Sequence, residues 1–335
     1  MLLYLAQKNT CSSAWKGGKN MQTVKHASRP HSQGQALKKE LRKNAGLYLL
    51  ALIPFVYLIL FKYWPMYGVQ IAFRDYRVAD GIWGSQWVGL KHFSRFLHTP
   101  KFLDIMKNTI IISLYGVLTF PLPILLAVML NYLSFPHYRK CIQMVSYAPH
   151  FISTVVMVAI LMQFLDKNNG LLNTLIEALG GKRVNFMAKR EYFYHIYQWS
   201  GVWQGLGFAS IIYISALSSV PPELHEAAIV DGANLCQRIW HIDIPSILPT
   251  ICILLIIQCG NILSVGYEKI YLMQNNLNAS TSEVISTYVY KQGLQSSTPQ
   301  YSYSTAIGLF TSIVNLMMLM LVNKLTNKLS GSGLW

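Results

Sequence analysis

The chain has 335 residues, of which 53% are hydrophobic and only 12% are charged, whereas soluble domains carry about 25% charged residues. Its formal net charge is +15, but the basic residues do not alternate with aromatic residues on one face, which argues against a nucleic-acid-binding protein. The apolar residues instead gather in runs of about 20, the length that a helix needs to cross a bilayer. We therefore expect an all-α polytopic membrane protein with no nucleic-acid partner.

A basic segment precedes the first apolar run. Its cations are Lys16, Lys19, Lys25, Arg29, Lys38, Lys39, Arg42 and Lys43. Basic residues next to an apolar helix are typical of the cytoplasmic side of a membrane, where anionic lipid attracts them. We expect residues 1–45 to form a mostly mobile cytoplasmic tail beside membrane lipid.

Helical apolar runs, separated by charge and turn clusters, predict six transmembrane helices. They span about 46–63, 106–131, 141–165, 196–217, 247–266 and 303–323. Six crossings place both termini on one side, and the cluster from Lys38 to Lys43 places that side in the cytoplasm. We therefore expect a transmembrane domain over 46–325 and a cytoplasmic C-terminal tail over 326–335.

The connections between these helices differ in length and polarity. Residues 64–104, 166–195 and 267–302 are expected outside as loops and short helices, and 131–140 and 218–246 are expected on the cytoplasmic side. Basic residues divide about evenly between the two sides, so the charge count alone does not set the orientation. Gly201 and Gly205 form a GxxxG pair in the fourth helix, which predicts a close helix contact there.

The cytoplasmic loop 218–246 carries clear helix signals. Ser219 is a candidate N-cap ahead of two prolines, and Glu223 lies in the first turn of the helix that follows. Gly232 stands where a left-handed residue is expected to end that helix. A second short helix over 234–241 leads into the fifth transmembrane helix.

Within this loop, Glu226-Ala227-Ala228 is followed by Gly232 and by Ile242-Asp243-Ile244-Pro245. This pattern resembles the signature of binding-protein-dependent ABC importer permeases. Ile244 replaces the usual leucine, which conserves volume. The resemblance covers roughly residues 40–335 and is closest to type I sugar permeases of the maltose, alginate and polysaccharide kind. Other similar segments are 67–73, 81–84, 148–154, 281–290 and 301–304.

The resemblance implies a permease subunit that forms half of a translocation path for a sugar or oligosaccharide by alternating access in a bacterial cell membrane. Its implied partners are a second homologous permease, two cytoplasmic ATPase subunits and an extracytoplasmic sugar-binding protein. ATP and Mg would be bound by the ATPase, with no cofactor in this chain. The implied ATPase-docking residues are Glu226, Ala227, Ala228, Asp231, Gly232, Ile242 and Pro245.

In the docking loop the alanines permit close approach, and Glu226 can meet an arginine of the ATPase through a charge-assisted hydrogen bond. Asp231 can add a second acidic contact or stabilise the turn. A sugar path also needs hydrogen-bonding and aromatic side chains within the spans. The candidates are Trp203, Gln204, Tyr213, Gln258, Asn261 and Asn315. The alternative is that the amides join helices to each other and that Trp199 belongs to an interfacial belt.

Two other function classes remain as alternatives. A membrane-embedded enzyme is one, but His225-Glu226 lacks the second histidine of a zinc motif, because Ile229 occupies that position, and the five cysteines lack metal-ligand spacing. An ion-coupled secondary transporter is the other, although ionisable residues are scarce in the spans. No phosphate-binding loop is present in the sequence, so ATP hydrolysis is expected in another chain. We expect a non-catalytic subunit without a metal site.

Overall fold

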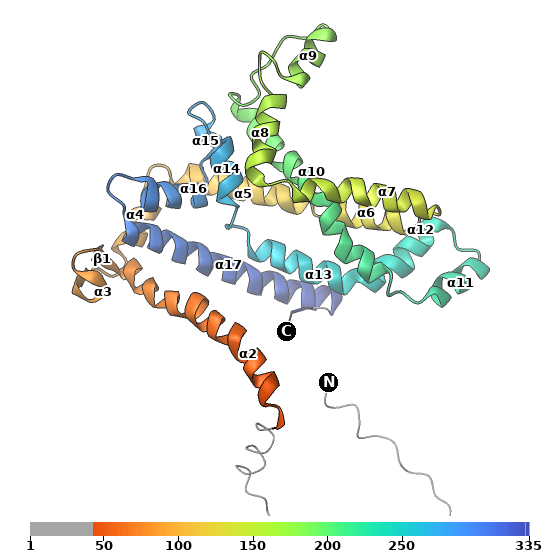
Figure 1. Cartoon of the computed structure of the whole chain (residues 1–335), viewed down its shortest axis with the longest axis horizontal. Coiled ribbons are helices and arrows are strands. Elements are labelled where there is room, and N and C mark those ends of the chain that lie inside the picture. The colour runs from red at the N-terminus through yellow and green to blue at the C-terminus, as the bar shows by residue number, and fades with distance from the viewer. Residues whose placement is uncertain (1–42, 332, 335) are drawn as a thin grey trace, which may run out of the picture. The chain divides into compact units, whose positions relative to one another are not determined.

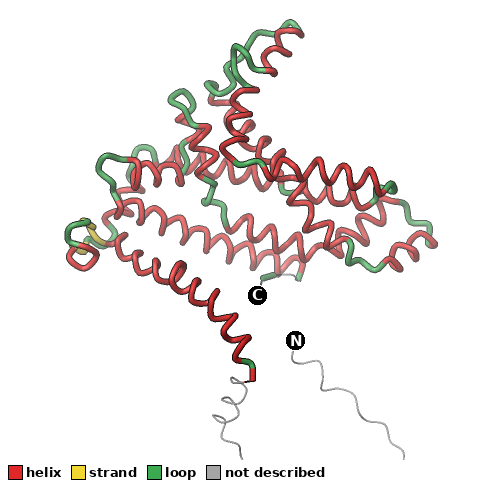
Figure 2. Tube along the Cα trace, in the orientation of Figure 1, coloured by secondary structure: helices red, strands yellow, loops and turns green. Residues whose placement is uncertain are grey.

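The computed structural model describes residues 43–331, 333 and 334. Helices dominate these residues, and the strands among them form one small antiparallel ribbon (Figure 2). The chain divides after Trp64 into two units, which are described separately. The predicted basic tail over 1–45 lies almost entirely outside the described residues.

The first unit contains helix α2 (Ala45–Leu58), which continues as the π-helical turn η1 (Ile59–Tyr63). Apolar residues surround α2 on all sides, and none of its side chains is buried. Leu47, Leu50 and Ile53 are each 68–69% exposed. A helix that is apolar all round is typical of a segment that lies in lipid or packs against another membrane protein.

Five helical stretches of the described chain are long and apolar enough to cross a membrane. They are Ala45–Phe73, Phe102–Asn131, Arg190–Leu217, Leu235–Gly260 and Tyr301–Lys328. A sixth results if the bent pair Pro136–Phe151 and Thr154–Phe164 is counted as one span. The prediction of an all-α membrane protein with six spans is therefore confirmed, although the boundaries differ.

These spans supply most of the helices of the second unit. The helices are α5 (Phe102–Thr119), α6 (Pro121–Asn131), α7 (Pro136–Tyr147), α8 (Thr154–Phe164), α10 (Arg190–Leu217), α12 (Leu235–Arg238), α13 (Ile244–Gly260) and α17 (Tyr301–Ser330). Long helices lie side by side because their apolar side chains pack in three buried clusters. In one cluster Ile124 of α6, Tyr213 of α10 and Ile247 of α13 meet.

The third predicted span is broken rather than continuous over 141–165. A 3₁₀ turn, η3 (Ala148–Phe151), ends the first half, and α8 then departs at an angle of 100°. Ser153 caps α8 by accepting the Val156 amide proton at 3.4 Å. The Gln204 side chain donates to the carbonyl oxygen of Ile152 at 2.8 Å, so a side chain from α10 satisfies a carbonyl that the break leaves free.

A compact group of short elements connects the first two spans, where only loops and short helices were expected. It comprises η2 (Trp64–Phe73), β1 (Arg74–Arg77), α3 (Gly81–Gly84), β2 (Ser85–Trp87) and α4 (Lys91–Leu97). The strands are antiparallel, with Arg74 opposite Trp87. Lys91 bonds Asp75 at 2.6 Å, and this contact, with His92 at 3.0 Å, holds the pKa of Asp75 below its usual value.

The connection between the fifth and sixth spans folds back into the core, although an outer loop over 267–302 was expected. It forms α14 (Tyr267–Met273), α15 (Ala279–Ser282), α16 (Ile285–Tyr290) and the π-helical turn η5 (Lys291–Gln295). Ile270, Met273 and Val284 are fully buried. They pack against α5, α8 and α10. This segment therefore belongs to the helical body.

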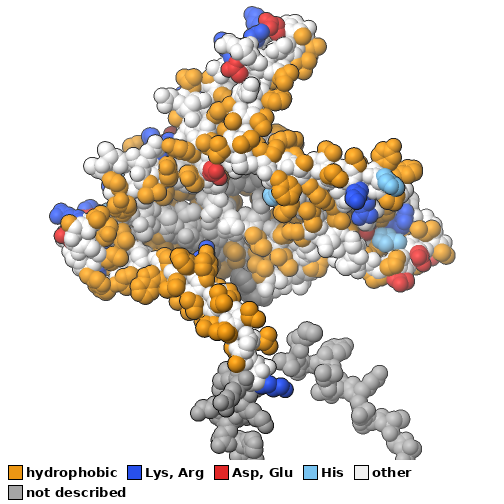
Figure 3. All heavy atoms as spheres, viewed as in Figure 1, with side chains coloured by type: hydrophobic (Ala, Val, Ile, Leu, Met, Phe, Trp, Pro, Cys, Tyr) orange, Lys and Arg blue, Asp and Glu red, His pale blue; other side chains and the backbone are white. Residues whose placement is uncertain are grey.

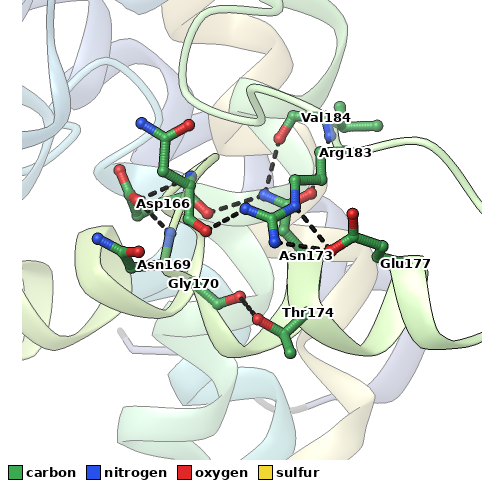
Figure 4. A network of polar contacts seen from close by, with 9 residues as sticks. Asp166, Asn169, Gly170, Asn173, Thr174, Glu177, Arg183 and Val184 are labelled. Atoms are coloured by element: carbon green, nitrogen blue, oxygen red, sulfur yellow. Dashed lines mark hydrogen bonds and ion pairs between the residues drawn. The ribbon is translucent and has the colours of Figure 1, made fainter.

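The connection between α8 and α10 carries α9 (Leu171–Ala178) and projects from the helices (Figure 1). We call residues 166–184 the outer arm. The fully buried Asn173 amide donates to the carbonyl oxygens of Asp166 and Val184, each at 2.9 Å, and accepts from the Val184 amide at 2.8 Å (Figure 4). Hydrogen bonds from the Asn169 and Asn168 amides hold the pKa of Asp166 below its usual value. Local contacts thus fix the shape of this arm.

The two ends of the second unit carry different elements. Helix α11 (Pro222–Val230) and α12 lie at one end of the long helices, and β1, α3 and α4 lie at the other (Figure 1). Charged side chains gather at these ends and at the tip of the outer arm, whereas apolar side chains dominate the surface between them (Figure 3). This distribution is what a bilayer around the middle of the long helices requires.

Candidate functional site

Helix α11 begins at Pro222 and carries the sequence Glu226-Ala227-Ala228. Proline suits the first helical position because its missing N–H would lack an intrahelical partner there anyway. The expectation that Ser219 caps this helix is wrong. Its hydroxyl donates to the carbonyl oxygen of Ala216 at 2.7 Å, and Pro221 is the N-cap residue, which has no side-chain hydrogen bond. Glu223 lies in the first turn, as predicted.

Helix α11 ends at Val230, and Gly232, two residues later, has the predicted left-handed conformation. Gly232 has a φ of 78°, which an L-residue with a side chain adopts only at a cost. Its amide donates to the carbonyl of Ile229 at 3.0 Å, and the Ala233 amide donates to the carbonyl of Ala228 at 2.8 Å. These two bonds form a Schellman motif, which turns the chain sharply after Asp231.

One face of α11 is open. Glu226 and Ala227 are exposed and Ala228 is partly exposed, while Val230 is 87% exposed. Among the described residues Glu226 has no ion-pair partner. Its carboxylate is therefore free to accept hydrogen bonds from another chain. Asp231 is also exposed, one residue before the turn.

The opposite face of α11 is held by a buried carboxylate. Asp243, in the π-helical turn η4 (Ile239–Asp243), has no exposed surface. One oxygen accepts a 2.5 Å hydrogen bond from the Tyr132 hydroxyl, and the other lies 3.3 Å from Nε2 of His225 on α11. Burial and the bond to Asp243 raise the pKa of Tyr132, which lies just beyond the end of α6, so the phenol stays protonated and donates.

The predicted short helix over 234–241 and the fifth span form one helix in the structure. Asn234 and Gln237 make a reciprocal capping box at 2.8 and 2.9 Å, and the helix then runs from Leu235 to Gly260 without interruption. The predicted end at 266 is wrong, because the helix stops at Gly260 and turns follow. Ile242 and Pro245 lie within this continuous helix, so the second half of the loop 218–246 is continuous with the span.

A shallow hollow of about 220 Å³ separates α11 from α12 and η4. Ala228, Ala233, Gln237, Arg238, His241 and Ile242 line it. The small side chains of Ala228 and Ala233 leave this space open. A side chain from a docked protein can therefore enter beside Ala228.

Two adjoining cavities lie among the spans. One of about 370 Å³ is lined by α5, α6, α10 and α13, and a second of about 250 Å³ shares Gly116, Gln198 and Gln258 with it. No described charged residue lines either cavity. The walls combine aliphatic side chains with a few amides and hydroxyls, which is the composition typical of a small-molecule site.

The structure brings three of the six predicted path residues to these cavities. Tyr213 and Gln258 line the larger cavity, and Gln258 and Asn261 line the smaller one. Trp203 lies on another face of α10, in a hollow shared with α7. Gln204 is engaged by the carbonyl of Ile152, as described above.

The side chain of Asn315 also forms hydrogen bonds within the protein. It accepts the Leu263 amide at 3.0 Å and donates to the Ser264 hydroxyl at 2.7 Å, so it joins α17 to the turn after α13. Trp199 is half exposed, and its indole donates to the Tyr115 hydroxyl at 2.9 Å. For Gln204 and Asn315 the geometry favours the alternative in which amides join helices.

Two polar residues that line the larger cavity, Gln198 and Thr119, were not among the predicted path residues. Gln198 donates to the Thr119 hydroxyl at 2.6 Å, and both line the larger cavity. The signal was the spacing of Gln198, Gly201, Gly205 and Ala209, which places one polar and three small side chains on one face of α10.

The predicted close contact at Gly201 and Gly205 is wrong. A Cβ atom at Gly205 would meet nothing within 4 Å, whereas one at Gly207 would overlap the backbone carbonyl of Ser146. The close approach of α10 and α7 therefore depends on Gly207. Gly201 and Gly205 instead keep the cavity wall free of side chains.

Comparisons with known proteins agree with this architecture. Residues 119–331 match the family described as binding-protein-dependent transport system inner membrane component. The polygalacturonan/rhamnogalacturonan transport system permease protein YteP of Bacillus subtilis (strain 168) is 40% identical over 318 residues, covering 92% of this chain and 98% of that protein. Protein LplB of the same strain is 38% identical over 88% of this chain and 92% of that protein.

A solved structure has the same fold. A chain of a bacterial ABC transporter involved in the import of the acidic polysaccharide alginate superposes with a TM-score of 0.81 at 37% identity, covering 88% of this chain and 99% of that chain. A chain of the alginate transporter in complex with an alginate pentasaccharide-bound periplasmic protein gives the same values. The chain studied here therefore belongs to the family of inner membrane components of binding-protein-dependent transport systems, the permease subunits of ABC importers.

Proposed function

We propose that this permease docks a cytoplasmic ATPase through α11 and Gly232 and forms half of a path for an oligosaccharide. The observation that carries the proposal is the exposed, unpaired Glu226 on a helix whose other face is anchored to buried Asp243. An arginine of the ATPase can pair with Glu226, and the small Ala227 and Ala228 permit backbone approach. Asp231, beside the turn, gives the docking face a second negative charge.

The proposed complex contains a pair of ATPase subunits, a second permease and a sugar-binding protein besides this chain. Two ATPase subunits would bind ATP and Mg, and a second, related permease would complete the path. With α11 in the cytoplasm, the C-terminal end of α17 is cytoplasmic, because α17 runs toward the end that carries α11 (Figure 1). Six crossings would place the N-terminus on the same side. The end that carries β1, α3 and α4 then faces outward, where an extracytoplasmic sugar-binding protein would dock. The ATPase alone would carry the catalytic activity of the complex.

The names of the relatives and the residues that line the cavities both support an oligosaccharide as the cargo. The relatives described above are named for polysaccharides or their fragments, and the two adjoining cavities present Gln198, Gln258 and Tyr213. Amide and phenol groups suit sugar hydroxyls because they both donate and accept hydrogen bonds. Alternating access, driven by movement of α11, would expose these cavities to each side in turn.

The docking role is tested by Glu226→Lys. A lysine would face the arginine of the ATPase, so we expect the ATPase to be lost on co-purification while the permease stays in the membrane. Glu191→Lys, which makes the same charge change at an exposed site at the start of α10, should keep the ATPase bound. Wild-type co-purification and uptake in the Glu226→Lys variant would refute the docking role.

A second measurement separates this proposal from ion-coupled transport. Proteoliposomes that hold the complete complex should accumulate oligosaccharide when ATP is supplied and no ion gradient is present. Uptake that follows an ion gradient and persists without the ATPase would favour a secondary transporter instead.

A further inference from the structure

Lys269 on α14 points its ammonium group into the helical body. Nζ donates to the backbone carbonyl of Tyr197 on α10 at 2.7 Å and lies 4.6 Å from the centre of the Tyr197 ring. Both partners are neutral. Among the described residues no carboxylate forms an ion pair with this lysine. Its charge is therefore balanced only by a carbonyl dipole and an aromatic face.

The ammonium group lies beside two residues of the cavity walls, Gly201 and Tyr197, although Lys269 itself does not line either cavity. A Cβ atom added to Gly201, which lines the larger cavity, would be 3.2 Å from Nζ. Tyr197, which binds Nζ, lines the smaller cavity. Gly201 has no side chain to separate the cation from the larger cavity, whose described lining carries no charged residue.

The lysine stays charged near neutral pH even though it is half-buried. Burial lowers the pKa of Lys269 to about 8, which is still above 7. An ammonium group has three N–H donors, and the Tyr197 carbonyl takes one of them. In surroundings of low dielectric constant, an incompletely paired cation attracts an anion far more strongly than it would in water.

We propose that Lys269 makes this path selective for oligosaccharides that carry carboxylates, so that the cargo is an acidic sugar. This inference rests on the proposed function, since it assigns a cargo to the same cavities. A neutral sugar could use Gln198 and Gln258 equally well. Only an anion gains from the ammonium beside Gly201, and that gain offsets part of the cost of keeping the charge away from water.

The competing role for Lys269 is a brace between α14 and α10. Lys269→Gln separates the two roles, because glutamine keeps an N–H donor for the Tyr197 carbonyl but has no charge. Lys269→Arg keeps the charge and the donor. A brace would tolerate glutamine, whereas a charge-selective path would not.

The test uses the complete complex with its binding protein in ATP-loaded liposomes. One cargo is a pectin digest of oligogalacturonates, and the other is the same digest after reduction of its carboxylates to alcohols, which keeps lengths and linkages. The binding protein is identical in all experiments, so a change in the ratio of the two uptake rates arises in the permease. We expect Lys269→Gln to lower uptake of the acidic digest about tenfold, a change of about 1.4 kcal/mol, with the reduced digest within about twofold of wild type.

The outcomes separate this inference from the proposed function. Lys269→Arg should match wild type with both digests. An equal effect of Lys269→Gln on both digests, or no effect on either, would overturn the selectivity and leave the importer role intact. Preference of the wild type for the reduced digest would do the same. If the wild type imports neither digest, the selectivity is overturned, and co-purification of Glu226→Lys, which needs no cargo, decides the docking role separately.

Discussion

The hydroxyl of Tyr132 donates a 2.5 Å hydrogen bond to Asp243, a carboxylate with no exposed surface. The second oxygen of Asp243 faces His225 on α11 at 3.3 Å. One buried group thus lies between the end of α6, helix α11 and the helix that becomes the fifth span. Loss of the Tyr132 hydroxyl would leave this buried carboxylate without its side-chain hydrogen bond.

Tyr132→Phe removes only the hydroxyl from this junction. We expect a loss of about 1–3 kcal/mol of stability, because a hydrogen bond to a buried carboxylate is removed. The thermal midpoint of the purified complex should fall, and cargo-stimulated ATPase activity should fall relative to basal activity. Tyr138→Phe is the control, since Tyr138 is 67% exposed and its hydroxyl has no hydrogen-bond partner among the described residues. Equal behaviour of the two variants would contradict a coupling role for Tyr132.

Gly207→Ala tests the close contact between α10 and α7. The added methyl group would overlap the backbone of Ser146, which cannot move aside as a flexible side chain can. We expect destabilisation of about 1–3 kcal/mol or failure to assemble. Gly205→Ala, two residues earlier, should be neutral or stabilising by up to about 1 kcal/mol, because open space surrounds it and alanine favours a helix. Thermal unfolding of both variants gives the comparison, and equal midpoints would show that the contact is unimportant.

Gly232→Ala tests the turn that closes α11. Alanine at a φ of 78° costs about 1–2 kcal/mol, so the end of the helix should fray. The expected result is weaker ATPase co-purification with normal membrane insertion. Gly232→Asn should be milder, since asparagine tolerates the left-handed conformation better. If alanine and asparagine reduce binding alike, backbone conformation is not the reason that glycine stands here.

Asn173→Ala tests whether the outer arm is held from within. The change removes three hydrogen bonds and leaves the carbonyl of Val184 without its side-chain partner, so amides over 166–184 should exchange hydrogen faster. Stimulation of the ATPase by the loaded binding protein should fall if the arm takes part in docking. Asn169→Ala is the control, because Asn169 contributes its backbone amide to the network rather than its side chain. Unchanged exchange in Asn173→Ala would exclude this internal support.

Local signals in the sequence were enough to place the spans and the docking loop. The apolar runs identified the transmembrane helices, and Pro222 and Gly232 identified the two ends of α11. Both signals could be read from the sequence because a span, a helix start and a helix end depend on residues that are neighbours in the chain. The break after Phe151 has local signals in Pro149 and the N-cap residue Ser153, but these do not predict the 100° angle between the two helices. It is supported by Gln204, a residue distant in the chain, and no local pattern reports such a partner.

The path residues show the same limit within a single helix. Residue type made Trp203, Gln204 and Tyr213 of α10 candidates for the path, but it did not identify which face of the helix borders the cavity. Trp203 and Gln198 lie on the same helix, and the structure places Trp203 against α7 and Gln198 at the cavity. Only the positions of the neighbouring helices decide between the two faces. The burial of Asp243 was also not predictable from the sequence, because its partners, Tyr132 and His225, lie in two other segments of the chain.

The uninterrupted helix from Leu235 to Gly260 has a mechanical consequence. Asp243 lies toward its first turns and Gln258 near its end, about 22 Å away at a rise of 1.5 Å per residue. If Asp243 acts as a fulcrum, a tilt of about 10° sweeps Gln258 sideways by about 4 Å, the arc that this length dictates. That displacement exceeds the diameter of a water molecule. A small rotation of this helix about Asp243 would thus produce a larger displacement at the cavity that Gln258 lines.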